Sequence, residues 1–214
     1  MINFEHPKRK EWLKLHHDRE HITASQVGTI MGVNSFESPE SLWYVKTGRM
    51  APFEGNTATT LGHALESTIG KLYKAKTGHK VKNPAGAYGI VRHPDHPWLL
   101  STLDRTIQYQ GCVHTDGVLT DEWDYEAPLE LKWSLNGYGF GEETMPLSYE
   151  LQLQVQMACI GATRGVLAAQ VGHGELRIYE REFKPRLMEK VIKKCEEFRR
   201  LCLSDERPEF AFTH

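Results

Sequence analysis

The sequence lacks a long apolar run and a secretory signal. Its longer uncharged stretches, such as 151–163, contain glutamine and fall short of the ~20 apolar residues that a membrane-spanning helix needs. The opening MINFEHPKRKEW carries charges without an apolar segment after them. We therefore expect no membrane span, no secretion and a cytoplasmic location.

The sequence also has few cysteines and almost no net charge. The four cysteines, Cys112, Cys159, Cys195 and Cys202, are 47, 36 and 7 positions apart. This spacing gives neither a Cys-x-x-Cys metal clamp nor a disulfide framework, so we expect reduced thiols. The 26 basic and 28 acidic residues leave a formal charge of −2. A polyanionic partner would therefore need a local basic patch.

The composition is that of an ordinary globular protein, with 40% hydrophobic and 25% charged residues. No repeat or low-complexity tract divides the 214 residues, so we expect one domain over 1–214. Helical patterns fill the first third: Thr23 and Gln26 have the spacing of a capping box, and a second short helix is expected before Gly48. Residues 57–77 carry one apolar stripe that stops at Gly78.

The middle of the chain changes to strand patterns. Short, turn-bounded strands are expected at 79–91, 98–107, 113–119 and 128–134. They are followed by an expected helix at 147–162, a hairpin at 165–171 and 175–183, and a charged helix at 185–203. This order predicts a mixed α/β fold.

The strand 128–134, PLELKWS, carries the most informative pattern. Its two-residue period places Glu130 and Lys132 on one face, and a sheet can bring Asp104 beside them. Neighbouring carboxylates bind a proton or a cation, and Mg²⁺ takes one or two carboxylates plus phosphate oxygens. A lysine beside that ion can stabilise charge on phosphorus. The trio therefore predicts a phosphodiester-cleaving site, and the alternative is an ordinary surface pair.

Two helical positions add to this pattern. Gly62 and Gly70 flank Glu66 on one helix face, where each glycine costs about 1 kcal/mol relative to alanine. The bare face lets a strand, or a phosphate and its metal, approach; the alternative is tight packing beside a solvated Glu66. Gln154 falls inside the apolar stripe of the helix at 147–162, so its amide must find partners. Gln154 is expected either to serve the site or to be a satisfied core residue.

Arg19, Thr23 and Ser25 form a candidate anion site. They bring a guanidinium group, hydroxyl groups and the amides of a helix N-terminus close together in the sequence. Helix capping explains Thr23 equally well.

Five motifs, in their order, resemble the phage lambda exonuclease family, also called YqaJ-like viral recombinases, of the PD-(D/E)XK nuclease superfamily. The motifs are ITAS at 22–25, LGHALEST at 61–68, HPWLLSTLDR at 96–105, LELK at 129–132 and LQLQVQM at 151–157. The resemblance covers about residues 10–200. It implies a restriction-endonuclease-like fold, a mixed central sheet flanked by helices, that forms a single exonuclease domain.

The resemblance implies a Mg²⁺-dependent 5′ to 3′ exonuclease that acts on ends of double-stranded DNA in phage-type recombination. Mn²⁺ is expected to substitute for Mg²⁺, with two ions in the site. A homotrimer, a single-strand annealing partner and a phage or prophage gene in a bacterial host cell are also implied. The alternatives are a RecB-like single-strand or structure-specific endonuclease, and a non-catalytic adaptor that binds DNA ends.

Carried onto this sequence, the resemblance implies a role for each motif residue. Asp104, Glu130 and the backbone carbonyl of Leu131 would hold the catalytic ion. Lys132 would orient or activate the attacking water, and Glu66 would bind a second ion or its waters.

The remaining family roles fall outside the acidic cluster. Gln154 would support the site lysine and the nucleophile, while Arg19 and Ser25, beside Thr23, would hold the 5′-phosphate. The family's arginine lies seven residues before the serine, where this chain has Asp18, so Arg19 is one position off.

The choice of the metal-binding aspartate has an alternative. The 25 residues between Asp104 and Glu130 exceed the compact hairpin of the phage enzyme. Asp116 therefore remains an alternative to Asp104 as the metal-binding aspartate.

Overall fold

The structure, a computed structural model, describes residues 2–83, 88–110, 113–115, 118–120 and 124–207. Its helices are α1 (Arg9–His17), α2 (Ala24–Ile30), α3 (Pro39–Lys46), α4 (Thr57–Thr77), α5 (Leu147–Ile160) and α6 (Pro185–Ser204). Its strands are β1 (Ile22–Thr23), β2 (Lys80–Lys82), β3 (Ile90–Arg92), β4 (Leu99–Thr102), β5 (Arg105–Gln110), β6 (Val113–Thr115), β7 (Val118–Thr120), β8 (Asp124–Ser134), β9 (Arg164–Val171) and β10 (Glu175–Glu182). None of the helices in these ranges is long and apolar enough to cross a membrane.

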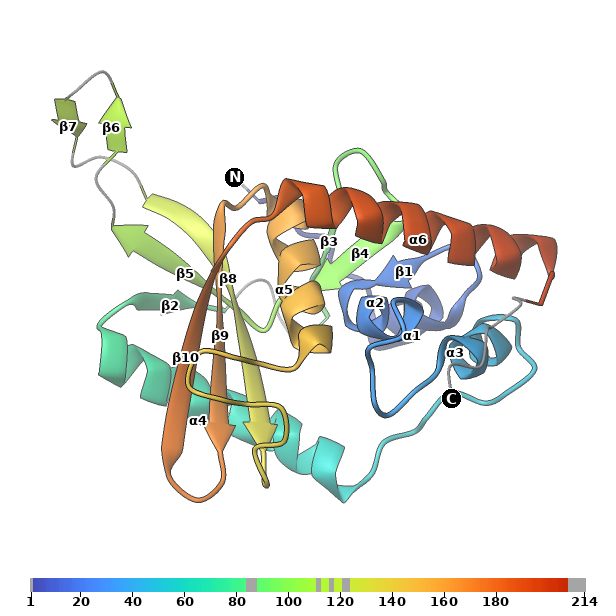
Figure 1. The fold of residues 1–214 in the computed structure, drawn as a ribbon, viewed down its shortest axis with the longest axis horizontal. Helices are drawn as coiled ribbons and strands as arrows, with labels where there is room; N and C mark the ends of the chain where they lie inside the picture. Colours follow the sequence, from blue (N-terminus) through green and yellow to red (C-terminus); the bar gives the residue numbers. More distant parts are fainter. Residues whose placement is uncertain (1, 84–87, 111–112, 116–117, 121–123, 208–214) are drawn as a thin grey trace.

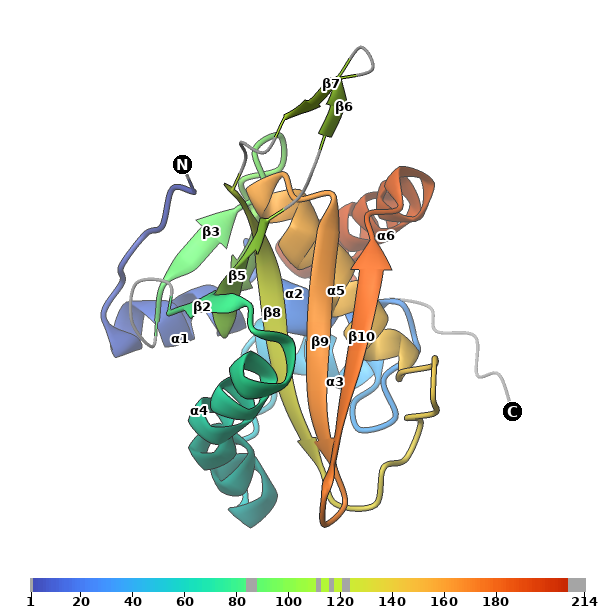
Figure 2. The same ribbon diagram turned by 90° about the vertical axis from the view of Figure 1, so that its left-hand side faces the viewer.

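A five-stranded mixed sheet, in the order β10-β9-β8-β5-β2, forms the centre of the fold. Only β8 and β9 are parallel neighbours within it, and α5 makes the crossover between them. Helix α4 covers one face of this sheet and α5 the other (Figures 1 and 2). The expected mixed sheet flanked by helices is confirmed.

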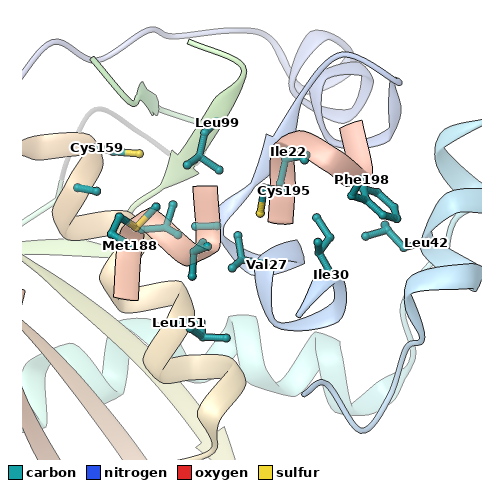
Figure 3. Packing of buried hydrophobic residues seen from close by; sticks show 14 of the residues in the cluster. Ile22, Val27, Ile30, Leu42, Leu99, Leu151, Cys159, Met188, Cys195 and Phe198 are labelled. Atoms are coloured by element: carbon teal, nitrogen blue, oxygen red, sulfur yellow. The ribbon is translucent and has the colours of Figure 1, made fainter. Parts of the chain in front are cut away.

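A second layer packs on the far side of α5. The small sheet β1-β4-β3 lies there with α2 and α6. Figure 3 shows their apolar side chains in one buried cluster, which includes Val27 of α2, Leu151 of α5 and Met188 of α6. Buried Cys159 and Cys195 belong to this core, and burial raises the pKa of each thiol to about 12. Cys159, Cys195 and Cys202 are free, whereas Cys112 lies outside the described residues.

Two expected strands prove to be broken. The expected strand 79–91 becomes β2 and β3 in different sheets, and the expected strand 98–107 becomes β4 and β5, also in different sheets. Asp104 stands at the second break, where the chain leaves the small sheet and joins the central one. By contrast, α4 has the bounds that the apolar stripe predicts, and Gly78 ends it in the left-handed conformation with φ 76°.

The close approach of α2 to α5 depends on Gly28. A Cβ atom at Gly28 would lie 2.6 Å from the Cβ of Ser148 and 2.9 Å from its Cα. Alanine there should force the helices apart and lower the free energy of unfolding by roughly 1–3 kcal/mol, measured by urea titration. Gly62→Ala is the matched control, since a Cβ at Gly62 would meet nothing within 4 Å and the gain in helix propensity should add up to ~1 kcal/mol. Equal stability of the two variants would contradict this packing.

Candidate active site

The candidate site lies where β5 leaves the edge of β8. The β5–β8 register ends at the pair Arg105 and Leu129, and from Glu130 onward β8 pairs only with β9. Asp104 takes the place of the missing strand, because its Oδ2 accepts a hydrogen bond of 2.8 Å from the backbone N–H of Leu131. The N–H and C=O of one strand residue point to the same side, so the Leu131 carbonyl faces this edge as well.

Glu130 is a buried carboxylate, 1% exposed, that three donors hold. Its Oε1 lies 2.6 Å from Lys132 Nζ and accepts a hydrogen bond of 2.7 Å from Gln152 Nε2. Its Oε2 accepts a hydrogen bond of 2.5 Å from Gln156 Nε2. Such bonds are what make a buried charge tolerable. Of about four lone-pair positions on the carboxylate, roughly one stays free, on Oε2.

Lys132 is held between a carboxylate and an aromatic ring. Its Nζ lies 4.9 Å from the ring centroid of Tyr149, the residue of α5 that precedes Gln152 by one helical turn. Burial alone would lower the pKa of Lys132, but the negative charges of Glu130 and Asp104 raise it above its usual value. Lys132 therefore stays protonated in this geometry.

The carboxylates repel one another. Burial, and then the charge of Glu130, raise the pKa of Asp104 well above its ordinary value, and Glu66 adds to the rise. Lys132 and the Leu131 N–H oppose it without cancelling it. The site without a ligand thus favours the binding of either a proton or a cation.

Glu66 approaches this cluster from α4. Its side chain is 28% exposed and pairs with His63 Nδ1 at 2.8 Å. One turn later, a Cβ at Gly70 would lie 3.5 Å from Leu131 Cδ1, so this glycine lets α4 pack closely on β8. Nothing within 4 Å explains Gly62, which faces open space. Tight packing of α4 on the sheet therefore explains Gly70 but not Gly62.

Gln154 does not reach the cluster, and the expectation that it supports Lys132 is wrong. It is fully buried, its Nε2 donates to the Glu182 carbonyl at 2.9 Å, and its Oε1 accepts from the Lys184 N–H at 2.8 Å. It is the satisfied core residue of the alternative, joining α5 to the connection between β10 and α6. On a helix, residues four apart share a face and residues two apart do not. The signal that would have identified the right pair was the repeat of the amide one turn apart, at Gln152 and Gln156.

Two residues of the candidate anion site, Thr23 and Ser25, contact each other, and Arg19 is held by other groups. Arg19 donates from Nη2 to the Thr47 carbonyl at 2.9 Å, and its Nη1 lies 3.0 Å from Asp205 Oδ1. Thr23 is buried and its backbone N–H donates to Gln26, as a capping box requires. Ser25 is exposed, with its hydroxyl 3.1 Å from that of Thr23. Arg19 is thus held at the ends of α3 and α6.

The cluster suits a hard divalent cation. No group of three or more His, Cys, Asp or Glu side chains in the described ranges has the geometry of a complete metal site. Mg²⁺ does not require one, since it binds through one or two carboxylates and substrate phosphates. Asp104, Glu130 and the Leu131 carbonyl offer oxygen donors alone, which fits Mg²⁺ or Mn²⁺. The alternative ligand Asp116 lies outside the described residues.

Comparison with known proteins gives both a family and relatives. The profile of the YqaJ-like viral recombinase domain matches residues 11–163. The curated protein YqaJ of Bacillus subtilis (strain 168) is 26% identical over 192 residues, which cover 86% of this chain and 53% of that protein. The chain therefore spans about half the length of the curated relative it matches.

The fold is also similar to solved structures. LHK-Exo, an alkaline exonuclease from Laribacter hongkongensis, is 18% identical with a TM-score of 0.64, over 92% of this chain and 94% of that chain. Its complex with dAMP gives 17% identity and a TM-score of 0.65, with the same shares of 92% and 94%. A phage related exonuclease from Haemophilus somnus 129PT is 12% identical with a TM-score of 0.61, over 86% of this chain and 96% of that chain. At these identities the similarity shows a shared fold.

The repulsion at Asp104 predicts an unusual stability effect. When folding raises the pKa of an acid, its contribution to the free energy of unfolding is fully present below the pKa of the unfolded state, which is 3.8 for Asp104. That contribution is lost as the pH rises through the raised pKa of the folded state. Asp104→Asn keeps an acceptor for the Leu131 N–H and removes the repelled charge, so in EDTA at pH 7 it should raise the free energy of unfolding. The gain should vanish near pH 3.8. Lys132→Met, which removes the balancing charge, should destabilise the protein at pH 7, and lower stability of Asp104→Asn there would contradict the repulsion.

Proposed function

Because the chain belongs to the YqaJ-like viral recombinase domain family, we propose that it is a Mg²⁺-dependent nuclease that digests double-stranded DNA from 5′ ends in phage-type recombination. The observation that carries the proposal is the convergence of Asp104, Glu130 and Lys132 at the open edge of β8. The complex of LHK-Exo with dAMP supports a deoxynucleotide as the class of ligand.

Each residue has a part that its contacts support. Asp104, Glu130 through Oε2, and the Leu131 carbonyl would hold Mg²⁺, which would neutralise phosphate charge and activate water. Lys132, held by Glu130 and beside Tyr149, would orient or activate the attacking water and stabilise charge on the phosphoryl oxygens. Glu66, whose charge acts on Asp104, would hold a second ion or its waters.

The α5 side chains keep this arrangement rigid. Gln152 and Gln156 fix the two oxygens of Glu130, and Tyr149 limits where the ammonium group of Lys132 can lie. Fixed charges stabilise a transition state at little reorganisation cost, so α5 contributes to catalysis without touching the substrate.

Polarity, preference for duplex ends, a homotrimer and a single-strand annealing partner complete the proposal, and they rest on the family. A ring-shaped trimer would enclose DNA and explain how a chain with a formal charge of −2 stays bound to it. The phosphate-binding role is proposed for exposed Ser25, with Thr23 supporting its hydroxyl. Arg19 would have to exchange its contact with Asp205 for a 5′-phosphate.

A linear 5′-phosphorylated duplex, labelled at either the 5′ or the 3′ end of one strand, tests this function. With Mg²⁺ or Mn²⁺, the 5′ label should appear in mononucleotides at once and the 3′ label last, and EDTA should stop digestion. Lys132→Met should lower the rate at least 10²-fold, because one electrostatic contact to the transition state is lost. Lys190→Met, a change at an exposed position of α6, should leave the rate unchanged.

Other products would identify other activities. Internal cleavage of a nicked circle or of single strands would favour the endonuclease alternative. DNA binding without cleavage in any divalent cation would favour the adaptor.

The two kinds of glutamine on α5 should differ in their effect on cation binding. Gln156→Leu removes a donor from Glu130 and should weaken Mg²⁺ binding about tenfold, as loss of an outer hydrogen-bond partner does. Gln154→Leu should cost stability at the β10–α6 connection and leave the Mg²⁺ affinity unchanged. Isothermal titration calorimetry measures both affinities. A larger loss of affinity in Gln154→Leu would refute the assignment of Gln156.

A further inference from the structure

The loop between β8 and α5, residues 135–146, carries exposed apolar side chains close to Lys132 in the chain. Leu135 is 60% exposed and Tyr138 is 77% exposed. The loop runs from the end of β8, which carries Glu130 and Lys132, to the start of α5, whose side chains hold these two residues (Figure 1). An exposed aromatic ring is not unusual by itself. The construction of this loop is what sets Tyr138 apart.

Two glycines hold the backbone on either side of Tyr138. Gly137 has φ 64° and Gly139 has φ 78°, values that side-chain-bearing residues rarely adopt. A Cβ at Gly137 would lie 2.6 Å from Val171 Cγ1, and one at Gly139 would lie 3.0 Å from Pro146 Cγ. The tip of the loop is therefore packed closely on its neighbours while the ring between the glycines points to solvent.

Strand β10 fixes the rest of the loop through its backbone carbonyls. Arg177 donates to the carbonyl of Phe140 at 2.6 Å, and the Tyr179 hydroxyl donates to that of Gly141 at 2.7 Å. Arg181 donates to the carbonyl of Glu143 at 2.7 Å. These three alternate residues of β10 lie on one face of the sheet. The loop is thus ordered before any ligand arrives, so little conformational entropy remains to be lost on binding.

An aromatic series joins this loop to the active site. The ring of Phe140 lies 5.9 Å from that of Tyr149 and 6.0 Å from that of Tyr179, between centroids. Tyr149 is the ring beneath the ammonium group of Lys132. Phe140 points into the protein while Tyr138, two residues earlier, points out. One loop therefore supports the site lysine on its inner side and offers an aromatic surface on its outer side.

We propose that Tyr138 stacks on the terminal base of the DNA strand that enters the site. This inference rests on the proposed function. A terminal or unpaired base has a face that no neighbouring base covers, and stacking on an aromatic ring is independent of sequence. Such a contact suits a nuclease that degrades any sequence from an end. A preordered ring would position the end relative to Lys132 without reading it.

Binding of a duplex with 2-aminopurine at its 5′ terminus tests the contact. The Lys132→Met chain is used so that digestion is slow enough for the bound DNA to be measured. Stacking on Tyr138 should quench the fluorescence, and adding Tyr138→Ala should remove the quenching and weaken binding about five- to tenfold, the low end for loss of one stacked base. Tyr138→Phe should retain both. Leu203→Ala, an exposed apolar residue at the far end of α6, should change neither (Figure 1).

Kinetics of the same substitutions in the chain that keeps Lys132 separate the two proposals. Tyr138→Ala should raise KM for DNA ends five- to tenfold with a smaller change in kcat. Intact digestion with the same KM and the same fluorescence in Tyr138→Ala would overturn the stacking contact alone. A change of oligomeric state in Tyr138→Ala with unchanged DNA binding would also overturn it, in favour of a contact between copies of the chain. Absence of DNA binding and cleavage by the unsubstituted chain would overturn both proposals.

Discussion

The hydrogen bond from the Leu131 N–H to Asp104 is the interaction on which the site depends. It closes the edge of β8 where β5 ends, so a side chain stands where a strand would otherwise continue. The same bond places the Asp104 carboxylate beside Glu130 and turns the Leu131 carbonyl toward it. Had the strand continued, its backbone would have filled this edge and left no room for a cation or a phosphate.

Around this edge, the structure stabilises charges that repel. Glu130 is buried only because Lys132, Gln152 and Gln156 satisfy its oxygens, and α5 is held in place by its crossover between β8 and β9. The raised pKa of Asp104 shows that the balance is incomplete. Repulsion between the carboxylates lowers the stability of the folded protein, and the same repulsion favours binding of a cation at this place. Functional sites often reduce stability in this way.

Much of this arrangement follows from the sequence, and the failures have physical causes. The apolar stripe of α4 and the shared face of Glu130 and Lys132 depend on local periodicity, which the sequence displays directly. The break at Asp104 depends on a partner 27 positions away, the Leu131 N–H, which an apolar run cannot reveal. Gln154 is buried, as its place in the helical stripe predicts, but its partners are not those expected. Backbone groups of the connection between β10 and α6 satisfy its amide, and a helical pattern cannot reveal such distant partners.

The most direct measurement of the central claim is anomalous diffraction from crystals grown with Mn²⁺. The account predicts an ion within about 2.5 Å of an Asp104 oxygen, of Glu130 Oε2 and of the Leu131 carbonyl. Lys132 Nζ should lie close by without contacting the ion. No bound ion at saturating Mn²⁺, or an ion held elsewhere while this cluster keeps its present contacts, would contradict it.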